Sequence, residues 1–241
     1  TSLFLILPIS SGELSSALDQ NLNGVMTKVT DWRHHFHQYP ELSNREFKTQ
    51  KSISEALIEM GLEPNTSYGK TGVTAFIRGQ NPGPLIALRA DIDGLPVTEK
   101  LNLPFSSKER TNYQGNDVGV MHACGHDAHI ATLLGVASFL SQNTDKLDGD
   151  ILLIFQPAEE GAPEGEEGGA ELMLKEGLFE AEKPDAIFGM HVSNSTHGQL
   201  WTRPGPIMAS AEAFRITVEG KQTHGSRPWN GVDPIVAASD S

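Results

Sequence analysis

The sequence is poor in cysteine, in basic residues and in long hydrophobic runs, and each shortage excludes a class of protein. Its single cysteine cannot form an internal disulfide. No stretch approaches the roughly 20 consecutive apolar residues that a membrane-spanning helix requires. Lys and Arg number 18 against 31 Asp and Glu, which gives a formal net charge of −13. So acidic a surface, without a local basic patch, repels phosphate backbones and anionic lipids, and we expect neither nucleic-acid nor membrane partners.

The N-terminal residues 1–17, TSLFLILPISSGELSSA, combine a short apolar run with small residues. They resemble the end of a secretory signal peptide without its basic beginning. This pattern predicts a residual signal peptide and a periplasmic or secreted protein. In the alternative interpretation, the run is a buried first strand and the protein is cytoplasmic.

Helical and extended patterns alternate along the next part of the chain. Apolar spacing predicts helices at residues 22–39, 43–61, 127–140 and 171–177, and strands at residues 72–79, 84–91, 150–157 and 185–192. Ser43 and Glu46 have the spacing of a capping box, and QNPG (80–83) predicts a hairpin turn between the first two strands. The alternation predicts an α/β fold, with a mixed, mostly parallel sheet flanked by helices.

The character of the sequence changes after about Trp201. Residues 213–225 have the pattern of an alternating strand, and DPIVAASDS (233–241) has that of a new helix. We therefore expect a first domain at residues 18–205 and the start of a smaller α+β domain at residues 206–241. Because the chain ends within an expected helix, it suggests a C-terminally truncated fragment.

The only cysteine lies in HACGHDAH (122–129), among three histidines. Thiolate and neutral imidazole are good ligands for zinc-like ions, which makes Cys124 and His126 candidate metal ligands. Gly125 between them relaxes the backbone of a turn just ahead of a predicted helix. In the alternative, His122 or His129 is a buried polar residue with satisfied hydrogen bonds, and Cys124 is a small buried hydrophobic residue.

Two predicted strands end in further candidate ligands. Glu159 and Glu160 follow one strand in FQPAEEG (155–161), and His191 follows another in FGMHV (188–192). Both strand ends are expected at the edge of the sheet where open α/β sheets bind ligands. One carboxylate can bind a metal ion while its neighbour stays free as a general base. Ligands from separate elements are typical of a catalytic site rather than a structural zinc site. The other acids of this loop are expected to be solvated: Glu164, Glu166 and Glu167.

Two more acids follow the strand in RADIDGLP (89–96). Asp91 and Asp93 are placed to orient a metal-binding histidine from behind. The alternative is that they only form a turn after the strand.

These motifs, together with WRHHFHQYPELSNREF (32–47), resemble those of the metal-dependent N-acyl-amino-acid amidohydrolases. That family includes hippurate hydrolase, indole-acetic-acid–amino-acid hydrolase and N-acyl amino acid deacylases, within the aminoacylase/carboxypeptidase-type metallopeptidase group. The resemblance extends from about residue 24 to the end of the chain. It implies a catalytic α/β domain with two divalent metal ions, zinc or manganese with cobalt or nickel as alternatives. It also implies a smaller lid domain that pairs subunits into a homodimer.

The resemblance implies roles for the residues of the first domain. Cys124 is expected to be the ligand shared by both metal ions. His126, Glu160 and His191 are expected to be further ligands, and Glu159 the general base.

The resemblance also covers a lid loop, and here the sequence departs from the family pattern. QTHGSRP (222–228) resembles the loop whose histidine stabilises the developing oxyanion, which assigns His224 to that role. Arg227 is the candidate for binding the substrate carboxylate. Trp229 stands where the family usually has histidine after proline, and the family's last histidine ligand would come from beyond residue 241.

The residues and the resemblance together predict hydrolysis of the amide bond of N-acyl amino acids by water activated at a di-metal site. A carboxypeptidase or dipeptidase on the same scaffold is the nearest alternative, because it also cuts an amide next to a carboxylate. A cysteine hydrolase with Cys124 as nucleophile would leave the two glutamates and His191 without a role. The non-enzymatic alternative is a metal-binding truncation without turnover.

Overall fold

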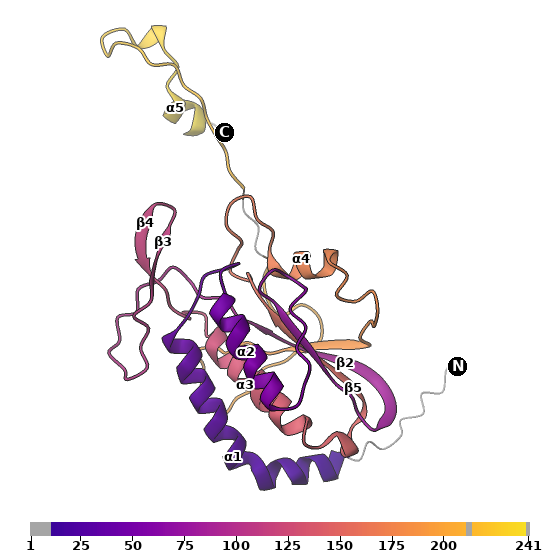
Figure 1. Cartoon of the computed structure of the whole chain (residues 1–241). Coiled ribbons are helices and arrows are strands. Elements are labelled where there is room, and N and C mark those ends of the chain that lie inside the picture. The colour runs from indigo at the N-terminus through magenta and orange to yellow at the C-terminus, as the bar shows by residue number, and fades with distance from the viewer. Residues whose placement is uncertain (1–10, 211–213, 240–241) are drawn as a thin grey trace. The chain divides into compact units, whose positions relative to one another are not determined.

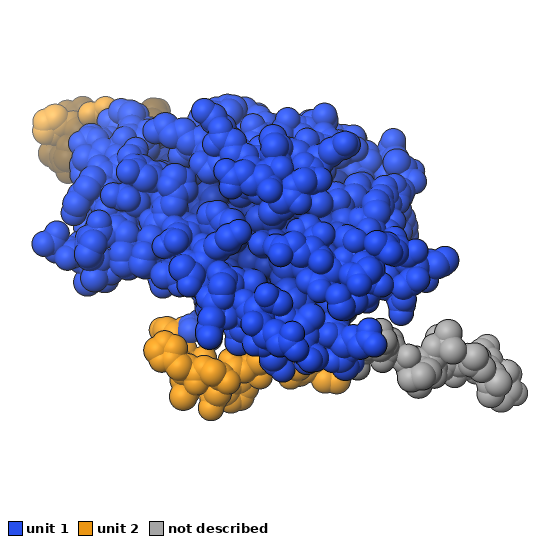
Figure 2. Space-filling view, turned by 60° about the horizontal axis from the view of Figure 1, so that its bottom comes forward, with its two compact units in different colours: residues 1–193 blue, residues 194–241 orange. Residues whose placement is uncertain are grey.

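The computed structural model describes residues 11–210 and 214–239 (Figure 1). The chain divides into two compact units, residues 1–193 and 194–241, coloured blue and orange in Figure 2. Among the described residues, no helix is both long and apolar enough to cross a bilayer.

The first unit is built on a four-stranded sheet. Its strands are β1 (Val73–Ile77), β2 (Asn81–Asp91), β5 (Asp148–Gln156) and β6 (Ala186–Gly189), in the spatial order β1-β5-β2-β6. β2 runs parallel to both β5 and β6, and β1 is antiparallel to β5. The predicted mixed, mostly parallel sheet is therefore confirmed.

The predicted hairpin between the first two strands is wrong, because β5 lies between β1 and β2. The residues that resemble a turn begin β2 instead. A Cβ atom on Gly83 would lie 2.4 Å from the backbone of Asp148, so this glycine permits close approach of two strands. Insertion of the strongly apolar β5 into the centre of the sheet buries both of its faces, which a local hairpin would not achieve.

Helices cover both faces of the sheet. α1 (Ser11–Gln38), α2 (Phe47–Glu59) and α3 (His126–Leu140) lie on one face, and α4 (Gly169–Lys175) lies on the other (Figure 1). Alternate residues of β5 reach the two cores: Leu153 and Phe155 pack towards α1–α3, and Leu152 and Ile154 pack towards Met173 of α4. The sequence prediction of a strand buried on both faces is confirmed here.

The N-terminal part of the chain differs from the prediction. α1 begins at Ser11, well before the expected residue 22. Residues 11–17 are helical, so for this part the alternative of a buried first strand is wrong. The apolar residues 1–10 lie outside the described residues.

The predicted capping box at the start of α2 is also wrong. The N-cap residue is Glu46 itself, and its side chain does not cap the helix. The carboxylate of Glu41 takes that place, because its Oε2 accepts hydrogen bonds from the amide (2.9 Å) and the hydroxyl (3.0 Å) of Thr49. Ser43 and Glu46 turn instead towards the first unit's interior, where they meet residues far along the chain.

A small hairpin of β3 (Arg110–Tyr113) and β4 (Asn116–Gly119) precedes the turn that leads into α3. A short 3-10 helix, η1 (Thr144–Lys146), connects α3 to β5.

The second unit contains a short 3-10 helix, η2 (Pro228–Asn230), and α5 (Pro234–Ser239). The predicted strand at 213–225 does not form over residues 214–225, where only Lys221 makes an isolated bridge, to Val232. Residue 213 lies outside the described residues. Phe214 and Ile216 carry the apolar alternation but are 88% and 71% exposed, because no partner strand is found within residues 214–239.

Candidate metal centre

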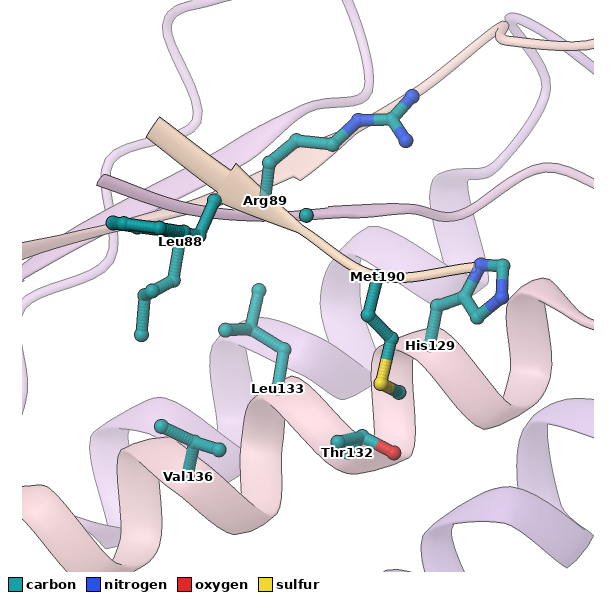
Figure 3. A pocket seen from close by; sticks show the side chains of 9 residues that line it. Leu88, Arg89, His129, Thr132, Leu133, Val136 and Met190 are labelled. Carbon is teal, nitrogen blue, oxygen red and sulfur yellow. The ribbon is translucent and has the colours of Figure 1, made fainter. Parts of the chain in front are cut away.

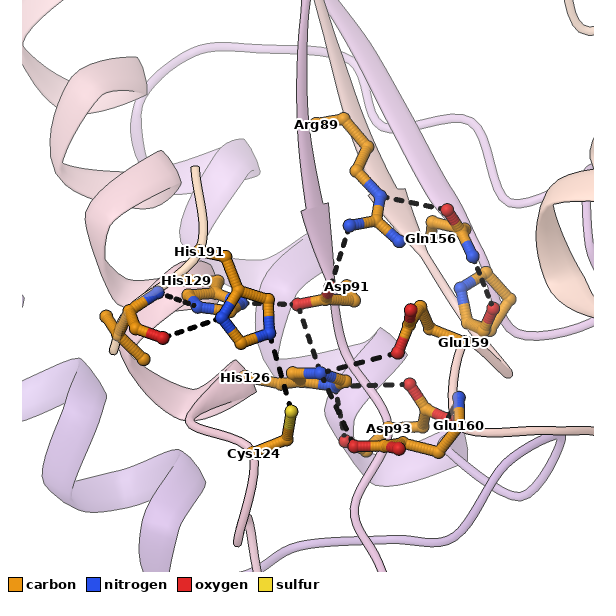
Figure 4. Close-up of polar contacts among 12 residues, drawn as sticks. Arg89, Asp91, Asp93, Cys124, His126, His129, Gln156, Glu159, Glu160 and His191 are labelled. Carbon is orange, nitrogen blue, oxygen red and sulfur yellow. Dashed lines mark hydrogen bonds and ion pairs between the residues drawn. The ribbon is translucent and has the colours of Figure 1, made fainter. Parts of the chain in front are cut away.

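Three parallel strands end at the same edge of the sheet, and their ends surround the predicted site (Figure 4). β2 ends at Asp91, β5 at Gln156 and β6 at Gly189. The turn before α3 reaches the same edge and supplies Cys124, and the first residue of α3 supplies His126. This placement follows from the parallel order, which brings the carboxyl ends of neighbouring strands together.

The predicted ligands from these segments lie within coordination reach of one another. Cys124 Sγ is 3.4 Å from His191 Nε2. His126 Nε2 is 3.7 Å from Glu160 Oε1 and 3.7 Å from Glu159 Oε2. Three groups of potential ligand atoms each lie within 4.8 Å: Cys124–His126–His191, His126–Glu159–Glu160, and Asp91–His126–His129.

Two site histidines each point Nδ1 at a backbone carbonyl; Nε2 of His126 has no hydrogen-bond partner among the described residues, and Nε2 of His191 contacts Cys124 Sγ. His126 Nδ1 lies 2.9 Å from the carbonyl oxygen of Asp93, and His191 Nδ1 lies 2.6 Å from that of Val192. A carbonyl can only accept, so both Nδ1 atoms carry the proton. In the neutral ring the Nε2 lone pair is then available, which is the arrangement that metal-binding histidines use.

The donor atoms present fit a divalent metal ion. His126 Nε2, Glu160 Oε1 and Asp93 Oδ1 are buried and have no hydrogen-bond partner among the described residues. Leaving such atoms unpaired costs free energy, and a bound cation would satisfy those that face it. A mixed set of thiolate, imidazole and carboxylate suits borderline ions such as zinc and its neighbours.

The two remaining histidines of the motif have different surroundings. His129 donates from Nδ1 to Asp91 Oδ1 (2.6 Å) and accepts at Nε2 from the Val192 amide (2.9 Å), so it is a satisfied buried residue. His122 is also buried, but neither ring nitrogen has a partner among residues that the structure describes. Burial lowers the pKa of His122 to about 4, which keeps it neutral.

Burial and neighbouring acids set the protonation of the site. Burial raises the pKa of the Cys124 thiol to about 11, and the charges of Glu160, Glu159 and Asp91 add to the shift. Burial and the charge of Asp91 likewise raise the pKa of Glu159. A divalent cation would reverse this effect on the thiol, because a coordinated thiol is deprotonated.

The two aspartates behind the site hold different partners. Burial would raise the pKa of Asp91, but the hydrogen bond from His129 and the charges of His126 and Arg89 outweigh it and lower the pKa to about 2. Asp93 Oδ2 accepts the amide of Glu160 at 2.9 Å. Asp93 thus contacts two predicted ligands. Asp91 orients His129, and its Oδ1 also lies 3.6 Å from His126 Nε2.

A pocket of about 190 Å³ lies beside this edge, between β2, β6 and α3 (Figure 3). Its lining is mostly apolar and includes Leu88, Leu133 and Met190, while the guanidinium of Arg89 points away from these side chains. His129 is the one residue that it shares with the ligand groups. The pocket is therefore a neighbour of the ligand cluster and not the cluster itself.

The lid residues expected from the sequence belong to the second unit. His224 is exposed, and its Nδ1 accepts the amide of Ser226 at 3.2 Å. Arg227 is exposed as well. Their roles in oxyanion and carboxylate binding stay predictions.

Sequence reasoning missed the segment Ser43–Glu46, which contacts the chain around the two site glutamates. Three of its four residues are polar yet buried, Ser43, Asn44 and Glu46, and this burial is visible only in the structure. A helix start that is exposed to solvent gives no reason to bury a carboxylate. A carboxylate that is buried requires hydrogen-bond partners.

An α/β sheet whose strand ends gather thiol, imidazole and carboxylate donors, with a further carboxylate beside them, defines the class of this domain: it is of the metallohydrolase type. The chain belongs to peptidase family M20/M25/M40, whose family model matches residues 87–238.

Relatives and a solved structure agree with this assignment. The chain is 45% identical over 224 residues to a thermostable carboxypeptidase of Saccharolobus solfataricus, covering 90% of this chain and 54% of that protein. It is 43% identical over 220 residues to an N-acetyl-L-cysteine deacetylase of Bacillus subtilis, covering 91% and 49%. A crystal structure from Bacillus subtilis, described as a dinuclear metal-binding peptidase of this family, matches with a TM-score of 0.62 and 42% identity, covering 71% and 44%. The chain spans about half the length of these curated relatives.

Proposed function

We propose that this protein hydrolyses the amide bond of N-acyl amino acids with the help of two bound divalent metal ions. The observation that supports this most strongly is the pair of carboxylates beside the converging ligands, with Glu159 Oε2 3.7 Å from His126 Nε2. Its neighbour Glu160 lies at the same distance, so the pair can divide the work of metal binding and proton transfer. The N-acetyl-L-cysteine deacetylase among the relatives fits this substrate class.

In the proposed mechanism, Cys124, His126, Glu160 and His191 would hold the ions. Such ions lower the pKa of a bound water towards about 7 and polarise the scissile carbonyl. Glu159 accepts the proton of the attacking water and later delivers it to the leaving amine.

Two residues of the second unit are proposed to bind the substrate. His224 is proposed to donate to the oxyanion and Arg227 to pair with the substrate carboxylate. Zinc or manganese is the proposed metal, with cobalt or nickel as alternatives. We also propose a homodimer and, from residues 1–17, export from the cytoplasm. Sedimentation analysis and cell fractionation test the last two.

A carboxypeptidase activity is the second candidate, favoured by the 45% identity to a thermostable carboxypeptidase. Both reactions cut an amide bond next to a carboxylate, and the ligand set is the same for both. The nature of the acyl side of the substrate, a simple acyl group or a second amino acid, is what distinguishes them.

The test is amine release from N-acetyl, N-benzoyl and indole-acetyl amino acids and from a matched set of dipeptides. It uses protein from the complete reading frame, with added metal and with EDTA. We expect metal-dependent release from the acyl amino acids. Release from dipeptides alone would favour the carboxypeptidase, and no release from metal-loaded protein would contradict both and leave a metal-binding protein without turnover.

A further inference from the structure

The segment Ser43–Glu46, between α1 and α2, makes side-chain contacts with the loop that contains both site glutamates. We propose that this segment, which we call the 43–46 clamp, is a positioning element that fixes Glu159 and Glu160, with Glu46 as its principal residue. The proposal rests on the proposed function for the roles of these two glutamates. It adds residues that touch neither metal nor substrate.

Glu46 holds the turn directly before the two glutamates. Its side chain is fully buried, and its Oε1 accepts the amide of Ala158 at 2.8 Å. Its Oε2 accepts the hydroxyl of Thr71 at 2.6 Å. Burial of a carboxylate costs solvation free energy. The two hydrogen bonds compensate part of this cost and hold Glu46 in place.

The residue that Glu46 holds has an unusual backbone conformation. Ala158 has φ of +47°, in the left-handed region that residues other than glycine rarely adopt. This conformation turns the chain sharply after β5, immediately before Glu159. A hydrogen bond to the Ala158 amide stabilises the turn that aims the next two side chains.

Ser43 supplies a second point of attachment through Asp93. The Ser43 hydroxyl (2.7 Å) and the Glu160 amide (2.9 Å) both donate to the same oxygen, Asp93 Oδ2. The carbonyl of Asp93 accepts Nδ1–H of His126 at 2.9 Å. Ser43 thus holds the side chain of Asp93. Asp93 in turn holds the backbone amide of Glu160 through its carboxylate and the His126 ring through its carbonyl.

The other two residues of the clamp hold the far end of the same loop. Asn44 Nδ2 donates to the carbonyl of Glu167 at 3.1 Å. Arg45 forms a two-point ion pair with Glu166, at 2.6 and 3.0 Å. All four consecutive side chains therefore contact residues 158–167, either directly or through Asp93. A helix start alone would not require these contacts.

The test compares Glu46→Ala, which removes the acceptor, with Glu46→Gln, which retains one oxygen for the Ala158 amide. Metal affinity is measured by competition with a chelating dye, and kcat and KM are measured at saturating metal. We expect Glu46→Ala to lose about 10–100-fold in metal affinity, as loss of support behind a ligand does. We expect kcat to fall at least tenfold with KM nearly unchanged, and Glu46→Gln to restore most of both.

Glu41→Ala is the matched control, because Glu41 caps the same helix through Thr49 without reaching the loop. It should lower the unfolding temperature but leave metal affinity and kcat at the wild-type values. If Glu46→Ala does not fold, Ser43→Ala is the milder probe, with an expected loss of about threefold to tenfold in metal affinity.

Wild-type metal affinity and kcat in a folded Glu46→Ala or Ser43→Ala variant would overturn the proposal. An equal loss in Glu41→Ala would also overturn it, because the effect would then be general destabilisation. The metal titration separates this proposal from the proposed function, since it gives a result even if the wild-type protein releases no amine.

Discussion

At the scale of single residues, the chain's only thiol decides between two kinds of chemistry. A nucleophilic cysteine requires a lowered pKa, and burial together with nearby acids gives Cys124 a pKa of about 11. Its Sγ lies 3.4 Å from His191 Nε2, and the two atoms form one group of potential metal ligands with His126. The residue is therefore expected to act through coordination and not through covalent catalysis.

We predict that Cys124→Ser loses tenfold or more in metal affinity, because a hydroxyl is a poorer ligand than a thiolate for borderline ions. Activity should fall at limiting metal and recover in part as metal is raised. Dialysis against graded metal followed by elemental analysis measures the affinity. A variant with wild-type metal content and no activity at any metal concentration would favour Cys124 as a nucleophile.

A second residue-scale prediction concerns His37, at the end of α1. His37 Nδ1 lies 2.9 Å from Asp127 Oδ2, and Nε2 lies 3.3 Å from Glu99 Oε1; Arg33 and His122 are the other charged or titratable groups near Asp127. The hydrogen bond to Asp127, opposed by burial and assisted by Glu99, raises the pKa of His37 above 6.5.

A raised histidine pKa means that the folded state binds the proton more tightly than the unfolded state. This contribution to stability is complete below pH 6.5 and is lost as pH rises through the higher folded pKa. We predict that the wild-type free energy of unfolding, from urea titrations in EDTA, falls more steeply between pH 6 and 8 than that of His37→Asn. Parallel pH profiles of the two proteins would contradict the assignment.

At the scale of elements, the start of α3 determines where Cys124 and His126 lie. Gly125 is the N-cap of this helix, with φ of +89°, and a Cβ atom there would lie 2.3 Å from Val192 Cγ2. Val192 directly follows His191. One added methyl group would therefore disturb the ligands on both sides of the site.

We predict that Gly125→Ala lowers metal affinity by about 10–100-fold and the free energy of unfolding by about 1–3 kcal/mol. Gly24→Ala is the control, since nothing lies within 4 Å of a Cβ there and the position is inside α1. It should raise stability by about 0.5–1 kcal/mol without changing metal affinity. Calorimetry and metal titration of both variants check the pair, and equal metal affinity in both would contradict the account.

The elements themselves could largely be predicted from the sequence, and their pairing could not. Apolar periodicity located α2, α3 and β5 because each has a local pattern. The order of the strands depends on which apolar strand is most deeply buried, so a turn signal at Gly83 gave a hairpin that does not form. The strand expected at residues 213–225 does not form over the described residues 214–225 for a related reason, since alternation alone supplies no partner strand.

At the scale of the whole molecule, the site is assembled from chain segments that are distant in sequence. Cys124 and His191 are 67 residues apart, and Glu46 and the Ala158 amide that it holds are 112 apart. The candidate ligands could be proposed from the sequence because each lies in a short motif, either after a strand or at the start of α3. The 43–46 clamp could not, because its meaning depends on contacts that only the fold creates.

Because the unfolded chain cannot hold these ligands together, metal binding should stabilise the folded protein by mass action. At a free metal concentration 100 times Kd, we predict a gain of about 2.7 kcal/mol in the free energy of unfolding. Thermal unfolding with EDTA and with added zinc or manganese measures it. The gain should shrink in Cys124→Ser, and an equal gain in that variant would indicate metal binding elsewhere on the acidic surface.

The most direct test of the central claim is a paired measurement of bound metal and amine release in the wild-type protein and in Glu159→Gln. We predict equal metal content in both proteins and a rate lower by about 10²–10⁴-fold in the variant, which retains the ligands but lacks the base. EDTA should abolish the wild-type rate, and added metal should restore it. A Glu159→Gln variant that binds metal and releases amine at the wild-type rate would contradict the account, as would a wild-type rate that EDTA does not change.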